Sequence, residues 1–107
     1  MTIFYVLKDR CIWRCDEEYV IRGIYDNWDM AWNEYKNLAS YLISYYEPQN
    51  GEDLTERKTE QDRISNLIAY GYSEDACYMF KDETGKNIHC IKIIAYIGNS
   101  EFIEEEY

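Results

Sequence analysis

The sequence predicts an α+β fold, in which an antiparallel sheet of about four strands carries one long and one weaker helix on one face. Three observations lead to this class. Residues 26–46 repeat apolar side chains at helical spacing, residues 54–70 carry a second helical pattern, and a pair of strand-like segments lies on each side of this helical region. The expected order is β-β-α-α-β-β, which is typical of a sheet with its helices on one side. The length of 107 residues predicts a single domain, 1–107.

The first hairpin is expected near the start of the chain. Residues 3–15 begin with apolar side chains on both alternating faces, which predicts a strand buried on two sides near its start. Residues 15–18 (Cys-Asp-Glu-Glu) are a turn candidate. Residues 19–25 are rich in the β-branched and aromatic types that favour strands. Gly23 within this second strand indicates a bulge or a close approach of two backbones.

The long helix is predicted over residues 26–46. Asp26 is a plausible N-cap, and Asp29 has the spacing of its capping-box partner. Pro48 and Gly51 are expected to end the helix. The steps of three and four place a set of apolar residues along one side. They are Trp28, Trp32, Tyr35, Leu38, Ala39, Leu42, Ile43 and Tyr46.

The polar stretch 47–63 is expected to be a loop that leads into the second helix. Asp53 and Glu56 have capping-box spacing, so a helix is predicted over residues 54–70. Gly71 would be its C′ residue, where glycine accepts a left-handed backbone.

The second hairpin is expected from residues 76–81 and 87–97, with a turn at 82–85 that contains Gly85. The last strand alternates strictly, and we expect its isoleucine face to pack on the long helix. Residues 99–107 form an acidic tail.

The charge balance limits the classes of partner. Asp and Glu number 21 against 11 Lys and Arg, so the formal net charge is −10. Such a surface disfavours direct binding to nucleic acid or to an anionic membrane, because both require cations. It favours a basic partner and fast, salt-sensitive association. The alternative is that the charge only keeps the protein dispersed.

The chain offers no sign of export. It has no run of about 18 apolar residues, and its N-terminus lacks a basic region followed by a cleavage site. We therefore expect a cytoplasmic protein. The aromatic share of 17%, with 12 Tyr, fits an interaction surface, although an AT-rich genome explains it equally well.

The cysteines and the single histidine are candidate ligands of a metal site. Cys11 and Cys15 have a spacing that zinc sites permit, and Cys77 with Cys90 would be the second pair, near His89. No Cys-x-x-Cys motif is present, so reduced, half-buried thiols are the favoured interpretation and no cofactor is predicted. Disulfides are disfavoured in the cytoplasm.

A catalytic site is not favoured either. A cysteine nucleophile needs a base, and His89 points to the opposite face from its neighbour Cys90. A pair of His89 with Cys77 across the hairpin stays open, but no third group to orient it is evident. No glycine loop for phosphate is present, so the sequence predicts a protein that is not an enzyme.

Clusters of carboxylates are the strongest remaining signal. Spaced along a surface, they can imitate a phosphate backbone and compete for a basic groove; the alternative is a set of solvated turns. The residues predicted to bind a partner are Asp16, Glu17, Glu18, Glu52, Asp53, Glu56, Glu60, Asp62, Glu74 and Asp75.

Two resemblances add to this interpretation. Phe4-Tyr5-Val6, a polar turn, and then Tyr19-Val20-Ile21-Arg22-Gly23-Ile24-Tyr25-Asp26 before a capped helix resemble the start of many small phage proteins, over about forty residues. The first turn is longer here and contains Cys11, Trp13 and Cys15. In overall character (short, acidic, Tyr-rich) the chain also resembles phage inhibitors of bacterial defence, including anti-CRISPR proteins, many of which occupy the DNA-binding groove of a nuclease. No residue motif carries this second resemblance.

The leading hypothesis is a stoichiometric inhibitor of phage or mobile-element origin that blocks a basic surface of a host nucleic-acid enzyme, such as a nuclease, as a DNA mimic. Two alternatives stay open. One is an immunity protein or antitoxin for a basic toxin. The other is a sponge for a signalling nucleotide, with a pocket from Arg14, Arg22, Trp13 and Trp28. A zinc-stabilised structural domain is a fourth class.

Overall fold

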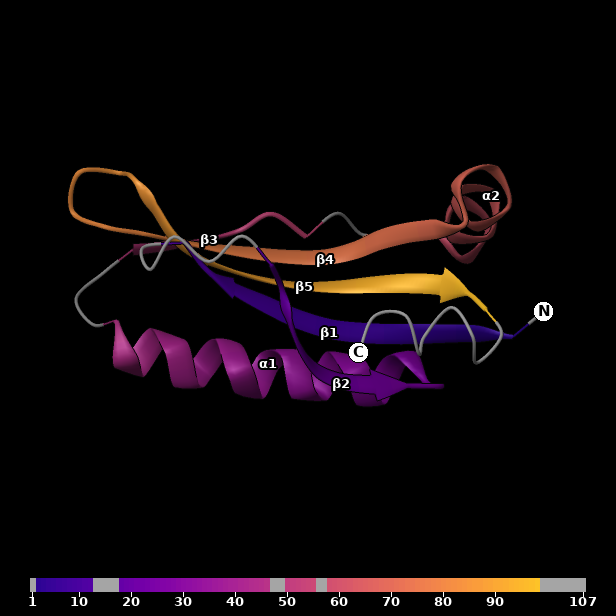
Figure 1. The fold of residues 1–107 in the computed structure, drawn as a ribbon, viewed down its shortest axis with the longest axis horizontal. Helices are drawn as coiled ribbons and strands as arrows, with labels where there is room; N and C mark the ends of the chain where they lie inside the picture. Colours follow the sequence, from indigo (N-terminus) through magenta and orange to yellow (C-terminus); the bar gives the residue numbers. More distant parts are fainter. Residues whose placement is uncertain (1, 13–17, 47–49, 56–57, 99–107) are drawn as a thin grey trace.

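A computed structural model gives the structure of the protein and describes residues 2–12, 18–46, 50–55 and 58–98. Within these residues the fold is α+β, with one antiparallel sheet and two helices (Figure 1). The elements are β1 (Ile3–Cys11), β2 (Val20–Tyr25), α1 (Trp28–Tyr45), β3 (Asn50–Asp53), α2 (Glu60–Tyr70), β4 (Tyr72–Lys81) and β5 (Asn87–Ile97).

The sheet contains one strand more than the sequence predicts. Its five strands run in the order β2-β1-β5-β4-β3, and every pair is antiparallel. The additional strand is β3, which pairs with the edge of β4 inside the stretch that was expected to be a loop. Its sequence, Asn-Gly-Glu-Asp, has no strand pattern of its own, so backbone pairing with β4 is what extends it.

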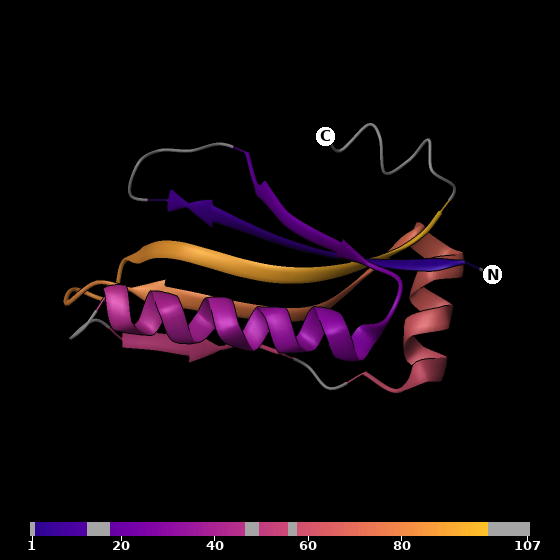
Figure 2. The same ribbon diagram turned by 90° about the horizontal axis from the view of Figure 1, so that it is seen from below.

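Helix α1 lies along one face of the sheet, and α2 lies at one end and runs across the direction of α1 (Figures 1 and 2). The predicted contact between the isoleucine face of β5 and the long helix is confirmed. Ile91, Ile93 and Ala95 share a buried core with one side of α1. The helix contributes Ala31, Tyr35, Ala39 and Leu42 to this core. Leu67 of α2 joins the same core.

The bulge expected at Gly23 is present in the β1–β2 hairpin. Leu7 pairs with Gly23 and Lys8 with Ile21, so Arg22 is the extra residue. The predicted turn with Gly85 is also confirmed, since Gly85 has a φ of 85°. Strand β1 ends at Cys11, earlier than expected, and residues 13–17 lie outside the described residues. Strand β4 begins at Tyr72, because the chain enters it directly after Gly71.

The helix ends differ from the predicted caps. Asn27, not Asp26, is the N-cap of α1, and its Oδ1 accepts a hydrogen bond from the backbone N–H of Met30 at 3.2 Å. Helix α2 begins later than predicted, with Thr59 as the N-cap in place of Asp53. The hydroxyl of Thr59 accepts a hydrogen bond from the backbone N–H of Asp62, which has no partner within the first turn of the helix. Thr59 therefore takes the capping role that was predicted for Asp53. Gly71 ends α2 in the left-handed conformation, as expected.

Neither described helix is both long enough and apolar enough to cross a membrane.

Candidate functional site

A pocket of about 410 Å³ opens between four parts of the chain. They are the first half of α1, the end of β3 with the residues after it, helix α2, and strand β4. This volume falls in the range of roughly 300–1,000 Å³ that is usual for small-ligand sites. Four segments that are distant in sequence contribute to it. We call it the tryptophan pocket, and its lining is Trp28, Trp32, Asp53, Thr55, Lys58, Arg63 and Asp75.

One wall of the tryptophan pocket is a column of stacked rings on α1. The ring centroids of Trp28 and Trp32 are 5.7 Å apart, and those of Trp32 and Tyr35 are 5.1 Å apart, with interplanar angles of 20° and 15°. Spacings of four and three residues place these rings above one another on the helix. Tyr35 is buried and its hydroxyl lies 3.3 Å from Oγ1 of Thr55. Burial raises the pKa of Tyr35, so its hydroxyl stays protonated.

Arg63 forms the inner part of the pocket. Its guanidinium lies 5.0 Å from the ring centroid of Trp28 and 5.6 Å from that of Tyr5, which is cation–π geometry. Its Nε donates to Oδ2 of Asp75. The other oxygen of Asp75 accepts a hydrogen bond from the Ser73 hydroxyl at 2.8 Å. Arg63 is therefore held between aromatic faces and a buried carboxylate.

The outer part of the pocket contains Asp53, Thr55 and Lys58. Asp53 is exposed, and its Oδ1 accepts the backbone N–H of Thr55 at 2.9 Å. Lys58 donates to the backbone carbonyl of Glu74. Thr55 is fixed to β4, since its hydroxyl oxygen accepts the N–H of Cys77 at 3.2 Å. Both cations in the lining thus already have a partner, whereas no ion pair to Asp53 is formed by the described residues.

The carboxylates that the sequence predicted as partner-binding have different surroundings. Asp16, Glu17 and Glu56 lie outside the described residues. Glu52 pairs with Lys81 at 2.9 Å and Glu74 with Lys92 at 3.3 Å. Asp75 is buried against Arg63 and presents no exposed charge. Glu52 is exposed although it is paired, and the exposed members without an ion pair among the described residues are Glu18, Asp53, Glu60 and Asp62. Three of these four belong to the pocket or to the first turn of α2, which precedes Arg63.

A second polar cluster lies on the α1 side of the sheet, away from the pocket. The buried carboxylate of Asp9 accepts hydrogen bonds from Nε of Arg22 at 2.6 Å and from Nη2 at 3.2 Å. Nε2 of His89 lies 2.8 Å from the same carboxylate, and Nδ1 of His89 lies 2.8 Å from the hydroxyl of Tyr46. Burial alone would raise the pKa of Asp9, but the hydrogen bonds from His89 and Arg22 lower it below its usual value. The cluster ties β1, β2, β5 and the end of α1 together.

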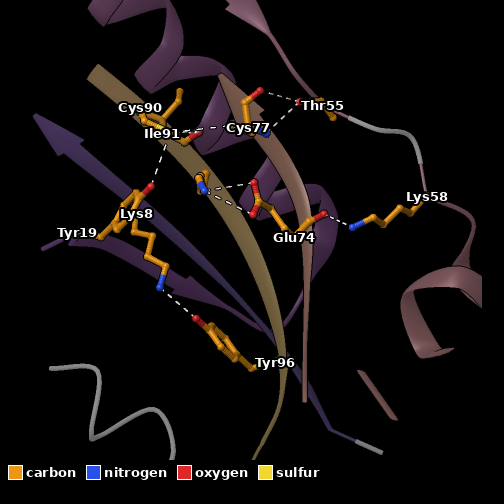
Figure 3. A network of polar contacts seen from close by, with 10 residues as sticks. Lys8, Tyr19, Thr55, Lys58, Glu74, Cys77, Cys90, Ile91 and Tyr96 are labelled. Atoms are coloured by element: carbon orange, nitrogen blue, oxygen red, sulfur yellow. Dashed lines mark hydrogen bonds and ion pairs between the residues drawn. The ribbon is translucent and has the colours of Figure 1, made fainter. Parts of the chain in front are cut away.

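A third cluster occupies the opposite face of the sheet (Figure 3). The thiols of Cys77 and Cys90 are 3.8 Å apart, and the hydroxyl of Tyr19 lies 3.9 Å from Cys90. Hydrogen bonding from Cys77, together with Tyr19 and the nearby charge of Lys92, lowers the pKa of Cys90 to about 7. The same contact with Cys90, together with burial, raises the pKa of Cys77. Both thiols are buried, so the pair lies in the interior of this face.

The arrangement of the strands separates the candidate groups for metal binding and catalysis. His89 contacts Asp9 and Tyr46 on the α1 side, whereas Cys77 and Cys90 meet on the other face, so His89 and Cys77 are not brought together. Among the described residues no group of three or more His, Cys, Asp or Glu side chains could hold a metal ion. Cys15 lies outside the described residues.

Comparison with known proteins does not assign the chain to a family. No protein-family description, curated protein or solved structure matches it.

The sequence pointed to only part of the tryptophan pocket. Trp28 was placed in a possible ligand pocket with Arg22, but Arg22 binds Asp9 elsewhere. Trp13 and Arg14 lie outside the described residues. Trp32 and Arg63 were missed as site residues. The spacing of four residues between Trp28 and Trp32 was visible, but such a pair on a helix is expected in a core as often as in a site.

Proposed function

We propose that this protein is a stoichiometric, non-catalytic inhibitor that binds a basic surface of a nucleic-acid enzyme and so excludes the nucleic acid. One observation carries the proposal: exposed carboxylates, Asp53, Glu60 and Asp62, accompany an open pocket whose wall is made of tryptophan. Acidic side chains attract and orient a basic partner, and aromatic side chains supply most of the contact energy in protein interfaces.

The charge of the whole chain supports the same assignment. A formal net charge of −10 repels nucleic acid but accelerates the approach of a basic groove, and this effect weakens as salt screens it. An inhibitor of this kind acts by occupancy and requires no cofactor. The proposal includes anti-defence inhibitors of phage origin, such as anti-CRISPR proteins that act in the host cytoplasm as DNA mimics.

The test begins with a tagged protein and a bacterial host lysate, at low and at high salt, with mass spectrometry of the retained proteins. We expect a nuclease or another nucleic-acid enzyme to be retained at low salt, released at high salt and displaced by duplex DNA. The purified target should then lose nucleic-acid binding at a one-to-one ratio with the inhibitor. Retention that DNA cannot displace would contradict the proposal.

A pair of matched variants tests where the surface lies. The variant D53N/E60Q/D62N removes the charge of Asp53 in the pocket lining and two charges in the first turn of α2, and E18Q/E34Q/E83Q removes three exposed charges elsewhere. We expect the first to slow association by about tenfold and the second to have a much smaller effect, because steering depends on charges near the contact. An equal effect of both variants would mean that net charge alone, and not this site, drives capture.

One specific observation favours a second candidate, the binding of a nucleotide. The tryptophan pocket has the volume of a small-ligand site and combines indole rings with Lys58 and Arg63. A base could stack on an indole while a phosphate approaches Lys58. The net charge of −10 and the engagement of both cations by Glu74 and Asp75 count against an anionic ligand.

A further inference from the structure

We infer that Cys77 and Cys90 form an oxidation site, at which hydrogen peroxide converts the two thiols into a reversible disulfide between β4 and β5. This site lies on the face of the sheet opposite α1, and its chemistry does not depend on the proposed function.

The register of the two strands brings the thiols together. Cys77 lies opposite Lys92, and Cys90 lies opposite Met79, so the two cysteines are diagonal neighbours on one face. Both are free cysteines, and their sulfur atoms are 3.8 Å apart (Figure 3). A disulfide bond is about 2.05 Å long, so the two sulfurs need to approach by about 1.8 Å.

The backbone of Cys77 is held in place by the segment that follows β3. Its carbonyl accepts the backbone N–H of Leu54 at 2.8 Å, and its own N–H donates to the hydroxyl oxygen of Thr55 at 3.2 Å. The approach of the two sulfurs is therefore made mainly by rotation of the side chains, which a staggered rotamer change can supply.

The surroundings make one thiol of the pair reactive at neutral pH. Hydrogen bonding from Cys77, together with Tyr19 and the charge of Lys92, lowers the pKa of Cys90 to about 7. The contact with Cys90, together with burial, raises the pKa of Cys77. The thiolate is the form of cysteine that attacks an oxidant. Cys90 is thus the attacking sulfur, and Cys77 keeps its proton until the second step.

A pocket gives a small oxidant access to the pair. Cys90 is 1% exposed and Cys77 is 8% exposed, so neither thiol lies open on the surface. However, Cys77 lines a pocket of about 220 Å³, and the other lining residues are Leu54, Lys58, Glu74 and Ala76. A water molecule occupies about 30 Å³ in the liquid, so this pocket has room for a molecule as small as hydrogen peroxide.

The reaction has two steps. The thiolate of Cys90 attacks one oxygen of hydrogen peroxide, the O–O bond breaks, and Cys90 becomes a sulfenic acid. The hydroxide that leaves takes up the proton that Cys90 had released. The sulfur of Cys77 then attacks the sulfenic sulfur, so that the S–S bond forms, the S–O bond breaks and water leaves with the proton of Cys77. In total the two thiols lose two electrons, and the peroxide is reduced to two molecules of water.

The same surroundings disfavour a metal ion at this position. A structural zinc site uses four ligands, and the described part of the chain contains no group of three or more His, Cys, Asp or Glu side chains that could hold a metal. The positive charge of Lys92 acts on Cys90, where it stabilises a thiolate but repels a metal cation.

The experiment treats the reduced full-length chain with hydrogen peroxide at neutral pH, blocks the remaining thiols and maps the linkage by mass spectrometry of a tryptic digest. Trypsin places the 4 cysteines on separate peptides, because a Lys or Arg lies between each one and the next. We expect the dominant product to join the peptides of Cys77 and Cys90, and dithiothreitol should reverse it. A dominant linkage between Cys11 and Cys15, or oxidation of Cys90 to a sulfinic acid without linkage, would overturn the inference.

The same chain unfolded in urea is the first control. It should lose the preference for the pair of Cys77 and Cys90, because only the fold brings these two thiols together. If the unfolded chain forms this linkage as fast as the folded chain does, the arrangement on the sheet has no part in the reaction and the inference is wrong.

Serine variants separate the roles of the two sulfurs. In C90S the thiol of Cys77 should react with peroxide at least about tenfold more slowly than in the natural chain, because the attacking thiolate is absent. In C77S the sulfenic acid of Cys90 should persist and be trapped by dimedone. C11S is the matched control and should form the disulfide at an unchanged rate. Equal loss of the Cys77 thiol in C90S and in the natural chain would overturn the inference.

Discussion

The buried carboxylate of Asp9 provides the sharpest test of what stabilises this sheet. Its side chain is 3% exposed and accepts hydrogen bonds from Arg22 at 2.6 and 3.2 Å and from His89 at 2.8 Å. Asp9→Asn keeps the size of the side chain but removes the charge, and it places an amide N–H₂ against at least one donor. We expect the free energy of unfolding to fall by roughly 3 kcal/mol.

The magnitude follows from the exposure of the partners. Removing one member of a fully buried ion pair costs about 3–5 kcal/mol, because the other charge is left without compensation. Here Arg22 is 50% exposed and can recover water, so the lower end of that range applies. His89 is buried, and among the described residues the hydroxyl of Tyr46 is then its one side-chain hydrogen-bond partner.

The assay is urea unfolding followed by tryptophan fluorescence, with Glu83→Gln as the matched control. Both variants change the net charge by one unit, but Glu83 is exposed in a turn and should change the stability by less than about 0.5 kcal/mol. Equal m-values are needed for the comparison. If Asp9→Asn and Glu83→Gln have the same stability at neutral pH, the cluster does not stabilise the sheet as described.

The pH dependence gives an independent check. The pKa of Asp9 is lowered from 3.8 in the folded state, so its contribution to stability is present above pH 3.8 and is lost as the pH falls through the lower folded-state value. The stability difference between the natural chain and Asp9→Asn should therefore shrink on strong acidification. A difference that stays constant down to full acid unfolding would contradict the assignment of the lowered pKa to Asp9.

Three further predictions concern single contacts. Tyr46→Phe removes the hydroxyl that meets His89 and should cost about 1 kcal/mol by urea unfolding, whereas no loss would mean that water replaces it. Gly71→Ala places a side chain at a φ of 81° and should cost about 1 kcal/mol by the same assay. Gly98→Ala, which has only ordinary contacts, is its control. Cys77→Ala removes the hydrogen bond that lowers the pKa of Cys90 to about 7, so the Cys90 Cβ chemical shift should titrate at a higher pH; an unchanged titration would assign the shift to Lys92 and Tyr19 instead.

The elements with a strong local period were predictable from the sequence. Helix α1 and strand β5 lie where their patterns of 3.6 and 2 residues place them, because each pattern alone defines an apolar side. The left-handed end at Gly71 was predictable because glycine tolerates a positive φ. The bulge beside Gly23 was predictable because a glycine inside a strand pattern often marks one. The N-cap of α1 was displaced by one residue, because Asp26 and Asn27 are both good caps.

The elements that depend on contacts with distant segments of the same chain were not predictable. Residues 50–53 form a strand only because the edge of β4 offers unpaired backbone groups, and their own composition favours a loop. The beginning of α2 was also misplaced, because Asp53 and Thr59 both carry capping side chains and the choice depends on what the helix packs against.

The candidate site was likewise predictable where it depends on a local pattern and not predictable where it depends on contacts between distant segments. The sequence by itself determined the class of the fold, the acidic charge and the placement of Trp28 and Trp32 on one side of a helix. Only the tertiary structure decided that those rings line a pocket, that Asp75 is buried under Arg63, and that Asp53 stays exposed in the lining of that pocket. The physical reason is that a local pattern defines which side of an element is apolar, whereas the environment of a charge depends on contacts between segments that are far apart in the chain.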